Sequence, residues 1–235
     1  MLEFKKAMIL AAGYGTRLKP LTDSLPKALV KVNGIPMIEH VLKRLIKFGF
    51  NYVVINTHHY ADKMEEYFSS RDYGIKIKLI NEKEILGTGG AIKNAAGYLN
   101  DVNWFLVHNV DILSEINFNA LLDFYFKHFP LTALAVKNRN TRRPLIIDSE
   151  MNLIGRASEN KGYRYRKPVG RESHFGFCGI HIISSAIFKL FSEEGFFDIF
   201  TSYFRLVNSE KIIVYDVRSS YWQDVGTLNN KIHSF

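Results

Sequence analysis

The chain has 235 residues, of which 47% are hydrophobic and 23% charged, and no run approaches the ~20 consecutive apolar residues of a membrane span. These proportions are those of a globular protein that does not enter a membrane, and the length suffices for a large core without disulfides. The single cysteine, Cys178, cannot form an internal disulfide. We therefore expect it to be buried, in a protein of a reducing compartment, the cytoplasm.

The net charge is +8, from 31 basic and 23 acidic residues. Basic proteins often bind nucleic acid, but here Lys and Arg are spread along the chain, and we find neither a basic helix nor an aromatic platform. We therefore expect no nucleic-acid partner. A basic cleft that binds small phosphorylated ligands accounts for the same charge.

In the first half of the chain, predicted strands alternate with predicted helices. Short apolar or alternating runs predict strands at 7–12, 52–56, 75–80 and 104–107. Apolar residues that recur on one helical face, or glycines that open a helix, predict helices at 35–48, 61–68, 87–99 and 118–129. This alternation is typical of a mostly parallel sheet with helices on both of its faces.

The second half is less regular. It has predicted strands at 131–137, 145–147, 177–183 and 212–217, and predicted helices at 186–191 and 197–206. We find no linker between the halves. We therefore predict a single domain over residues 1–235, with a nucleotide-binding N-terminal half and a substrate-binding C-terminal half.

The first predicted strand ends in a loop that contains Gly13 and Gly15. Glycines let a backbone approach phosphate closely, and ligands of open α/β sheets bind at the carboxyl ends of strands. The pair alone is a weak signal, but Arg17 and Lys27 follow it and supply the cations that triphosphate chemistry requires. Two rival motifs are excluded, because Leu18 replaces the third glycine of a dinucleotide fingerprint and no Gly-Lys-Ser/Thr of a P-loop is present.

The complete pattern is Leu-Ala-Ala-Gly-x-Gly-Thr-Arg-Leu-x-Pro-Leu-Thr over residues 10–22, then Pro-Lys-x-Leu-x-x-Val-x-Gly-x-Pro over 26–36. It resembles the signature of sugar-1-phosphate nucleotidyltransferases. The resemblance implies a Rossmann-like α/β fold of the nucleotide-diphospho-sugar transferase type. It also implies that Arg17 grips the triphosphate, that Lys27 contacts the reacting phosphates, and that the nucleotide is held by the loop residues Leu10, Ala11, Ala12, Gly13, Gly15 and Thr16.

A second glycine-rich segment, Leu-Gly-Thr-Gly-Gly at 86–90, opens the predicted helix at 87–99. The N–H groups at a helix start can bind an anion or a base edge, although the same glycines are equally typical of a tight turn. In the family a similar segment lies against the nucleobase, which implies nucleotide contacts for Gly87 and Thr88. The resemblance also gives Glu82 a role at the base edge. Because a carboxylate accepts hydrogen bonds, this role favours uracil or guanine, while a solvated surface glutamate is the other interpretation.

Two aspartates complete the resemblance. Asp111 follows the predicted strand at 104–107, at the edge of the sheet where ligands bind, although the family usually has Gly-Asp where this chain has Val110-Asp111. Asp224 lies in Trp-Gln-Asp-Val-Gly-Thr, which is similar to the family's second metal segment. The resemblance implies that both bind Mg²⁺, which requires only one or two carboxylates when water and phosphate oxygens complete its shell.

For the sugar, the resemblance indicates Asn109 and Gly179, the latter in a strand of small residues. Many family members also carry a lysine near this strand that binds the sugar phosphate. Lys167, followed by Pro168, is the only candidate that we find for this role.

The implied activity is Mg²⁺-dependent transfer of a nucleotidyl group from a nucleoside triphosphate to a sugar 1-phosphate, with release of pyrophosphate. The compact length and Thr88-Gly89-Gly90 most resemble short bacterial enzymes similar to N-acetylmuramate α-1-phosphate uridylyltransferase. This favours UTP, N-acetylmuramate 1-phosphate and a place in cell wall recycling. Mannose- or heptose-1-phosphate guanylyltransferases are the alternative, and phosphocholine-activating enzymes that use CTP rank below both.

An alternative of another class is a non-catalytic nucleotide-sugar sensor or subunit. Such domains tend to lose the metal-binding aspartates or the basic residues. Arg17, Lys27, Asp111 and Asp224 are all present, so we expect an enzyme. A monomer and a homodimer are both compatible with the sequence.

Overall fold

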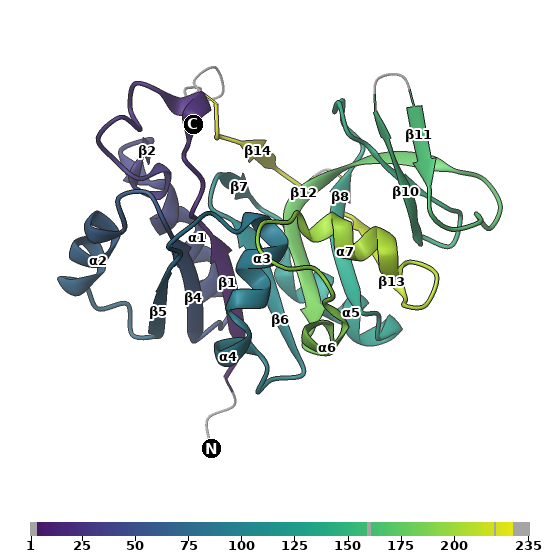
Figure 1. The fold of residues 1–235 in the computed structure, drawn as a ribbon, viewed down its shortest axis with the longest axis horizontal. Helices are drawn as coiled ribbons and strands as arrows, with labels where there is room; N and C mark the ends of the chain where they lie inside the picture. The colour runs from purple at the N-terminus through teal and green to yellow at the C-terminus, as the bar shows by residue number, and fades with distance from the viewer. Residues whose placement is uncertain (1–3, 159–160, 219, 228–235) are drawn as a thin grey trace.

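A 10-stranded sheet runs through the computed structural model, which describes residues 4–158, 161–218 and 220–227 (Figure 1). The body of the sheet has the order β5-β4-β1-β6-β12-β8-β13, and every strand except β12 points the same way. These strands are β1 (Lys6–Leu10), β4 (Tyr52–Thr57), β5 (Lys76–Asn81), β6 (Trp104–Asn109), β8 (Thr132–Lys137), β12 (Ser173–Ser184) and β13 (Ile212–Asp216).

Helices cover both faces of this sheet (Figure 1). One hydrophobic core lies beneath α1 (Met37–Lys47) and α5 (Phe118–His128), and α2 (Ala61–Ser69) reaches it through Met64. The other core lies beneath α3 (Gly87–Asn94), α4 (Ala96–Leu99), α6 (Ile187–Leu190) and α7 (Ile199–Leu206). Alternate residues of β1 enter the two cores, which is why its sequence is a continuous apolar run.

An antiparallel ribbon extends from the N-terminal part of β12 and stands at one side of the molecule in Figure 1. It consists of β9 (Leu145–Ile147), β10 (Leu153–Ser158) and β11 (Lys161–Arg164). The remaining elements are short and lie outside this sheet. They are the 3-10 turns η1 (Thr16–Leu18) and η2 (Lys27–Leu29), and the strand pairs β2 (Lys31–Val32) with β3 (Ile35–Pro36) and β7 (Ile112–Ser114) with β14 (Trp222–Asp224).

The predicted α/β class, with a mostly parallel sheet covered on both faces, is confirmed. Some boundaries differ. The first strand ends at Leu10 rather than at residue 12, and α1 begins at Met37 because Ile35–Pro36 pairs with β2 around a turn at Asn33 and Gly34, both with positive φ. The helix predicted at 87–99 is interrupted at Ala95.

Cys178 is buried, as expected, and burial raises the pKa of its thiol to about 12. No helix within the described ranges is both long enough and apolar enough to cross a membrane.

Candidate active site

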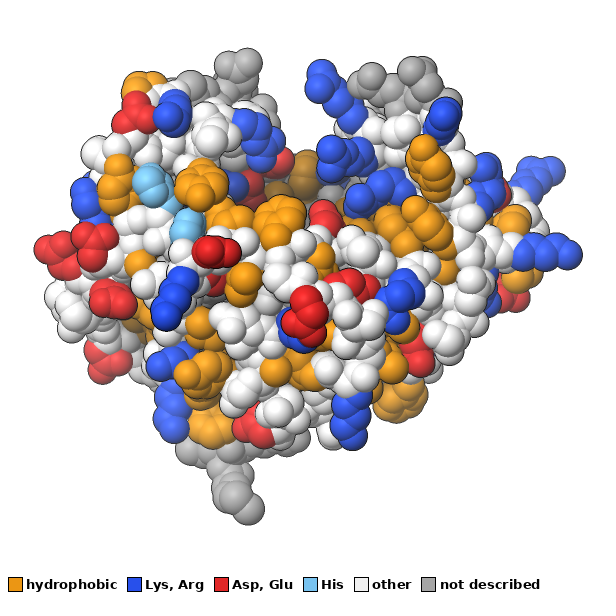
Figure 2. Space-filling view, in the orientation of Figure 1, with side chains coloured by type: hydrophobic (Ala, Val, Ile, Leu, Met, Phe, Trp, Pro, Cys, Tyr) orange, Lys and Arg blue, Asp and Glu red, His pale blue; other side chains and the backbone are white. Residues whose placement is uncertain are grey.

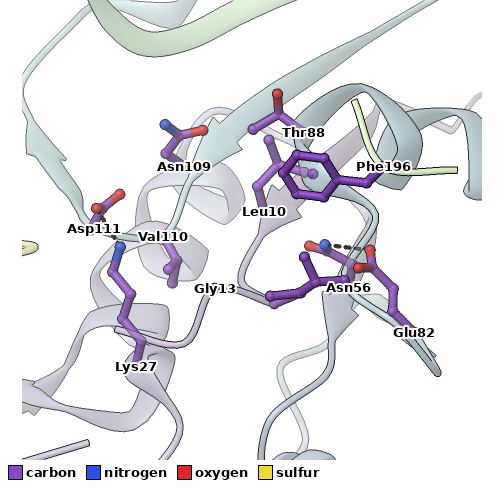
Figure 3. Close-up of a pocket in the computed structure, with 13 residues that line it drawn as sticks. Leu10, Gly13, Lys27, Asn56, Glu82, Thr88, Asn109, Val110, Asp111 and Phe196 are labelled. Atoms are coloured by element: carbon purple, nitrogen blue, oxygen red, sulfur yellow. Dashed lines mark hydrogen bonds and ion pairs between the residues drawn. The ribbon is translucent and has the colours of Figure 1, made fainter. Parts of the chain in front are cut away.

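The carboxyl ends of β1, β4 and β6 meet at one edge of the sheet, where Leu10 pairs with both Asn56 and Asn109. A cavity of about 300 Å³ opens there (Figure 3). Nine residues selected from the sequence line this cavity: Leu10, Ala12, Gly13, Lys27, Glu82, Gly87, Thr88, Asn109 and Asp111. The topology therefore brings together segments that lie up to about 100 residues apart in the chain.

The first glycine loop is fixed at its base and open at its tip. The Ala11 N–H donates to Asn56 Oδ1 (2.8 Å), and Gly15 is held in the left-handed conformation (φ 66°) with its carbonyl bonded by Thr22 Oγ1 (2.9 Å). Around Gly13, by contrast, a Cβ atom would meet nothing within 4 Å. The loop is thus rigid in shape, while the backbone at Gly13 is accessible to a ligand that lies in the cavity.

Four charged side chains gather at one end of the cavity. The Lys27 ammonium donates to Asp111 Oδ2, and both of these side chains are largely buried. The Arg17 guanidinium lies 3.8 Å from Asp111 Oδ2 and 4.0 Å from Asp224 Oδ2, with 58% of its side chain exposed. Lys27 and Asp111 are therefore held in place, whereas Arg17 has room to reach toward a bound anion. Gly15 and Thr16 lie beside this group, since a Cβ on Gly15 would lie 3.1 Å from Lys27 Cβ and Thr16 precedes Arg17 in η1.

The two aspartates approach each other because β14 pairs with β7. Asp224 lies opposite Ile112, and the Val225 N–H donates to the Asp111 carbonyl (2.8 Å). Gly226 lies between the carboxylates, so that a Cβ there would be 2.5 Å from Asp111 Oδ2 and 2.9 Å from Asp224 Oδ1. The Arg17 guanidinium lies 3.1 Å from the same point, so only a residue without a side chain fits among these three charged groups.

The donor set fits Mg²⁺. Hard carboxylate oxygens from Asp111 and Asp224 lie close to one point beside Gly226, and Mg²⁺ usually takes one or two carboxylates plus phosphate and water oxygens. Within the described residues no group of three or more His, Cys, Asp or Glu forms a cation site made of protein ligands alone. The arrangement therefore suits a cation that arrives together with a phosphorylated ligand.

The opposite end of the cavity is polar and buried. Glu82 is 3% exposed, and its carboxylate accepts hydrogen bonds from Asn56 Nδ2 (2.8 Å) and the Leu86 N–H (3.1 Å). Burial raises the pKa of Glu82, while the bonds from Asn56 and Leu86 act in the opposite direction. Glu82 is thus not a solvated surface residue, and its fixed oxygens face the cavity beside Asn56 (Figure 3).

The second glycine-rich segment differs from the expectation that its N–H groups are free. The Gly89 and Gly90 N–H groups both donate to the Phe197 carbonyl (2.9 and 3.4 Å), and a Cβ on Gly89 would lie 2.2 Å from the Phe197 ring. Thr88 Oγ1 accepts a hydrogen bond from the Ile199 N–H (2.9 Å) at the start of α7. Gly87 and Thr88 line the cavity, but the glycines that follow them allow α3 to pack against the segment before α7.

Asn109 and Gly179 are in contact, because a Cβ on Gly179 (φ 73°) would lie 3.0 Å from Asn109 Nδ2. Lys167 does not line the cavity. It is exposed in the loop before β12, and the residues around it bond elsewhere, Arg166 to the Val207 carbonyl and the Val169 N–H to Asp148. The role of Lys167 at the sugar phosphate stays a prediction, and its loop is held at the end of α7 and at the turn before β10.

Three residues of the site were missed from the sequence. Asn56 bridges the first loop to Glu82, Phe196 lines the cavity with 69% of its surface exposed, and Gly226 separates the aspartates. A polar residue near the carboxyl end of a predicted strand could have indicated Asn56. Phe196 gives no such signal, because it belongs to a loop that reaches the site only through the packing of Phe197 on α3.

Residues 6–234 match the nucleotidyl transferase family, and the chain therefore belongs to this family. The bifunctional protein GlmU of Methanocaldococcus jannaschii is 30% identical over 226 residues, which cover 94% of this chain and 51% of that protein. A mannose-1-phosphate guanyltransferase of Candida albicans is 31% identical over 234 residues, covering 94% of this chain and 61% of that protein. The chain thus spans about half to three-fifths of the length of these relatives.

Among solved structures, a UDP-glucose pyrophosphorylase of Acinetobacter baumannii is similar with a TM-score of 0.80. The match has 17% sequence identity and covers 97% of this chain and 91% of that one. At this level of identity the likeness concerns the fold, and it agrees with the predicted nucleotide-diphospho-sugar transferase type.

Proposed function

We propose that the protein is an enzyme that transfers a nucleotidyl group from a nucleoside triphosphate to a sugar 1-phosphate and releases pyrophosphate, with Mg²⁺ as its cofactor. The observation that carries the proposal is the meeting of Lys27, Arg17, Asp111 and Asp224 beside the open backbone of Gly13. Family membership and relatives named for such transferases support it. The lone buried Cys178 and the substrates fit a cytoplasmic enzyme.

In the proposed reaction a phosphate oxygen of the sugar 1-phosphate attacks the α-phosphorus of the triphosphate. The bond from the α-phosphorus to the oxygen that bridges it to the β-phosphorus breaks, and pyrophosphate leaves with that electron pair. Lys27 and Arg17 would offset the charge that develops on the phosphates, and Gly13 would let the backbone lie against them. Bound at Asp111 and Asp224, Mg²⁺ would withdraw charge from the reacting phosphate oxygens.

At the buried end, Glu82 would accept the ring N–H of the base and Asn56 would hold the carboxylate in position. This requirement is met by uracil and guanine, which have a ring N–H donor, and not by cytosine. UTP with N-acetylmuramate 1-phosphate is our first substrate pair. GTP with mannose 1-phosphate is the second, and the printed names of several relatives favour it.

At the sugar end, Asn109 and Gly179 would contact the sugar ring. A Cβ on Gly179 would lie 2.8 Å from Ile112 Cγ1 and 3.0 Å from Asn109 Nδ2, so this glycine lets Asn109 lie directly against β12 and would position its amide for the sugar. Leu10, Ala11, Ala12 and Thr16 would complete the walls around the nucleotide.

Pyrophosphate release tests the proposal. The purified protein would be incubated with Mg²⁺, each of UTP, GTP, CTP and dTTP, and a panel of sugar 1-phosphates that includes N-acetylmuramate and mannose 1-phosphates. We expect release with UTP or GTP and not with CTP. Nucleotide binding without release from any pair would contradict the proposal and indicate a non-catalytic sensor.

A further inference from the structure

A second cavity, of about 480 Å³, lies between the β10–β11 ribbon and α7. It is distinct from the site above, because no residue lines both cavities. Figure 2 shows Lys and Arg side chains gathered beside hydrophobic ones over this part of the molecule. Three arginines and four aromatic rings contribute to the lining, which contains one acidic residue, Asp198.

Arg156 is the most unusual member of this lining. Its guanidinium carbon lies 4.3 Å from the centroid of the Phe200 ring and 5.3 Å from that of Phe204. Its Nε atom is buried without a hydrogen-bond partner, and none of the described residues forms an ion pair with it. Arg156 as a whole is only partly buried, so the rest of its guanidinium can reach an anion that enters the cavity.

Arg143 adds a second positive charge to the same cavity. Both Arg143 and Arg156 line the cavity. Burial lowers the pKa of Arg156, the Asp198 carboxylate raises it, and the charge of Arg143 lowers it. Asp198 forms no ion pair with either arginine among the described residues, and its Oδ1 atom caps α7 by accepting the Phe200 N–H (2.8 Å). Arg205 is different, since it is already bonded to Glu193 (2.9 and 3.1 Å). Two guanidinium groups are thus available to one anion.

The exposed aromatic part of the lining is Tyr163 and Tyr165, which are about half exposed. Tyr165 stacks on Phe204 with centroids 4.7 Å apart and planes inclined by 12°, which fixes the orientation of its ring. Arginine binds carboxylate and phosphate through its planar fork, and an exposed aromatic ring offers an apolar surface to the C–H groups of a sugar. The cavity volume is in the range of small-molecule sites, roughly 300–1,000 Å³.

The two cavities are neighbours across residues 196–200. Phe196 lines the first, while Asp198 and Phe200 line the second. The intervening segment is held in place by the bonds from Gly89 to Phe197 and from Ile199 to Thr88. A ligand in the second cavity therefore lies against the same short segment that forms one wall of the proposed active site.

We propose that the second cavity binds an anionic sugar, with Arg143 and Arg156 on its carboxylate or phosphate and its ring against Tyr163 and Tyr165. Such an anion has two sources: the far end of an acid-bearing sugar 1-phosphate substrate, or a separate sugar phosphate that acts as an effector. The first source rests on the proposed function, and the second does not.

Calorimetric titration of the nucleotide-bound protein with glucose 6-phosphate and glucuronate tests this site, with glucose as the neutral control. We expect saturable binding of the two anions only. Arg143→Gln should weaken it by about tenfold or more, the effect of losing a charge-assisted hydrogen bond. Because Arg143 is exposed, this variant should fold normally, and Arg142→Gln is the matched control that leaves binding unchanged.

Arg156→Lys provides a second variant that keeps the charge and removes the planar fork, and it should also weaken binding. Equal binding of glucose, or anion binding that neither Arg143→Gln nor Arg156→Lys affects, would overturn the proposal. Asp111→Asn protein, which should lack turnover, must still bind the anions. A failed transferase assay is therefore distinguishable from a failed second site.

The source of the anion follows from the kinetics of the unmodified protein and of Arg143→Gln. A higher KM of Arg143→Gln for glucuronate 1-phosphate, with the KM for glucose 1-phosphate unchanged, assigns the site to the far end of the substrate. Unchanged KM values for both sugar 1-phosphates, together with weakened binding of glucose 6-phosphate in calorimetry, assign it to a separate effector.

Discussion

The two glycine-rich segments of this protein are similar in sequence and opposite in their surroundings. A Cβ atom added at Gly13 would meet nothing within 4 Å, whereas one added at Gly89 would lie 2.2 Å from the Phe197 ring. The first segment leaves its backbone open toward the cavity and the charged group, and the second brings α3 against the chain before α7. A glycine pattern thus indicates that something approaches the backbone closely, but the fold decides whether that is a ligand or another part of the chain.

The largest effect is expected from the carboxylates beside the first segment. Asp111→Asn should lower kcat for pyrophosphate release by about 10³-fold, because it removes a charge from the group that would hold Mg²⁺ and that pairs with Lys27. Removal of divalent metal with EDTA should abolish turnover of the unmodified protein, and added Mg²⁺ should restore it. Circular dichroism would establish that the Asp111→Asn protein is folded.

Asp101→Asn is the control for this carboxylate. Asp101 pairs with Lys6 (2.6 Å) at the start of β1, at the other end of that strand from the cavity. Its replacement should affect stability while kcat remains within about twofold, since surface carboxylates remote from the site make no contact with substrate. Substantial turnover by Asp111→Asn protein would contradict the catalytic role that we assign to the charged group beside the first segment.

The comparison is tested directly by two alanine substitutions. Gly89→Ala should lower the free energy of unfolding by about 1–3 kcal/mol, because its Cβ would collide with Phe197. Gly13→Ala should leave the unfolding transition unchanged and raise the KM for the nucleotide by about tenfold, since its methyl group would occupy space needed by phosphate. Urea denaturation and steady-state kinetics on both variants measure these effects. The reverse pattern would show that the roles of the segments have been assigned the wrong way round.

Phe196 extends the comparison to the chain that covers the second segment. It is an exposed aromatic residue that lines the cavity, so a bound base or ribose would cover it. Phe196→Ala should raise the KM for the nucleotide by about tenfold, the low end of base–aromatic stacking, with little change in kcat. Phe129→Ala, which removes an equally exposed ring outside the cavity, is the matched control. A KM increase confined to the sugar 1-phosphate would place the ring on the sugar instead.

Much of the fold could be predicted because the central strands are buried on both faces. β1 and β6 are therefore apolar runs, and α1 presents a regular apolar stripe to its core. β11 could not be predicted in this way, because all four of its residues are exposed and no buried face imposes a period of two. β14 pairs with β7 over more than a hundred residues of sequence, and a three-residue strand carries too little pattern to reveal such a partner.

The charged part of the site could be predicted because each motif carries its own chemistry. The resemblance selected Arg17, Lys27, Asp111 and Asp224, and the structure brings these four side chains into one group. What the sequence does not disclose is how residues support one another. Asn56 acts by joining Ala11 to Glu82, and this role exists only because β1 and β4 are neighbours.

The smallest effect is expected at Thr88, a residue of the second segment that both lines the cavity and takes part in packing. Thr88 lines the cavity, yet its hydroxyl accepts the Ile199 N–H at the start of α7. If that bond is its main role, Thr88→Val should lower the free energy of unfolding by about 1 kcal/mol, the value of a helix N-terminal bond, with the KM for the nucleotide within about twofold. Thr88→Ser keeps the hydroxyl and should resemble the unmodified protein. A tenfold KM increase in Thr88→Val with unchanged stability would mean that the hydroxyl serves the ligand. In that case the second segment would share the ligand-facing character of the first at this position, while its glycines would remain packing residues.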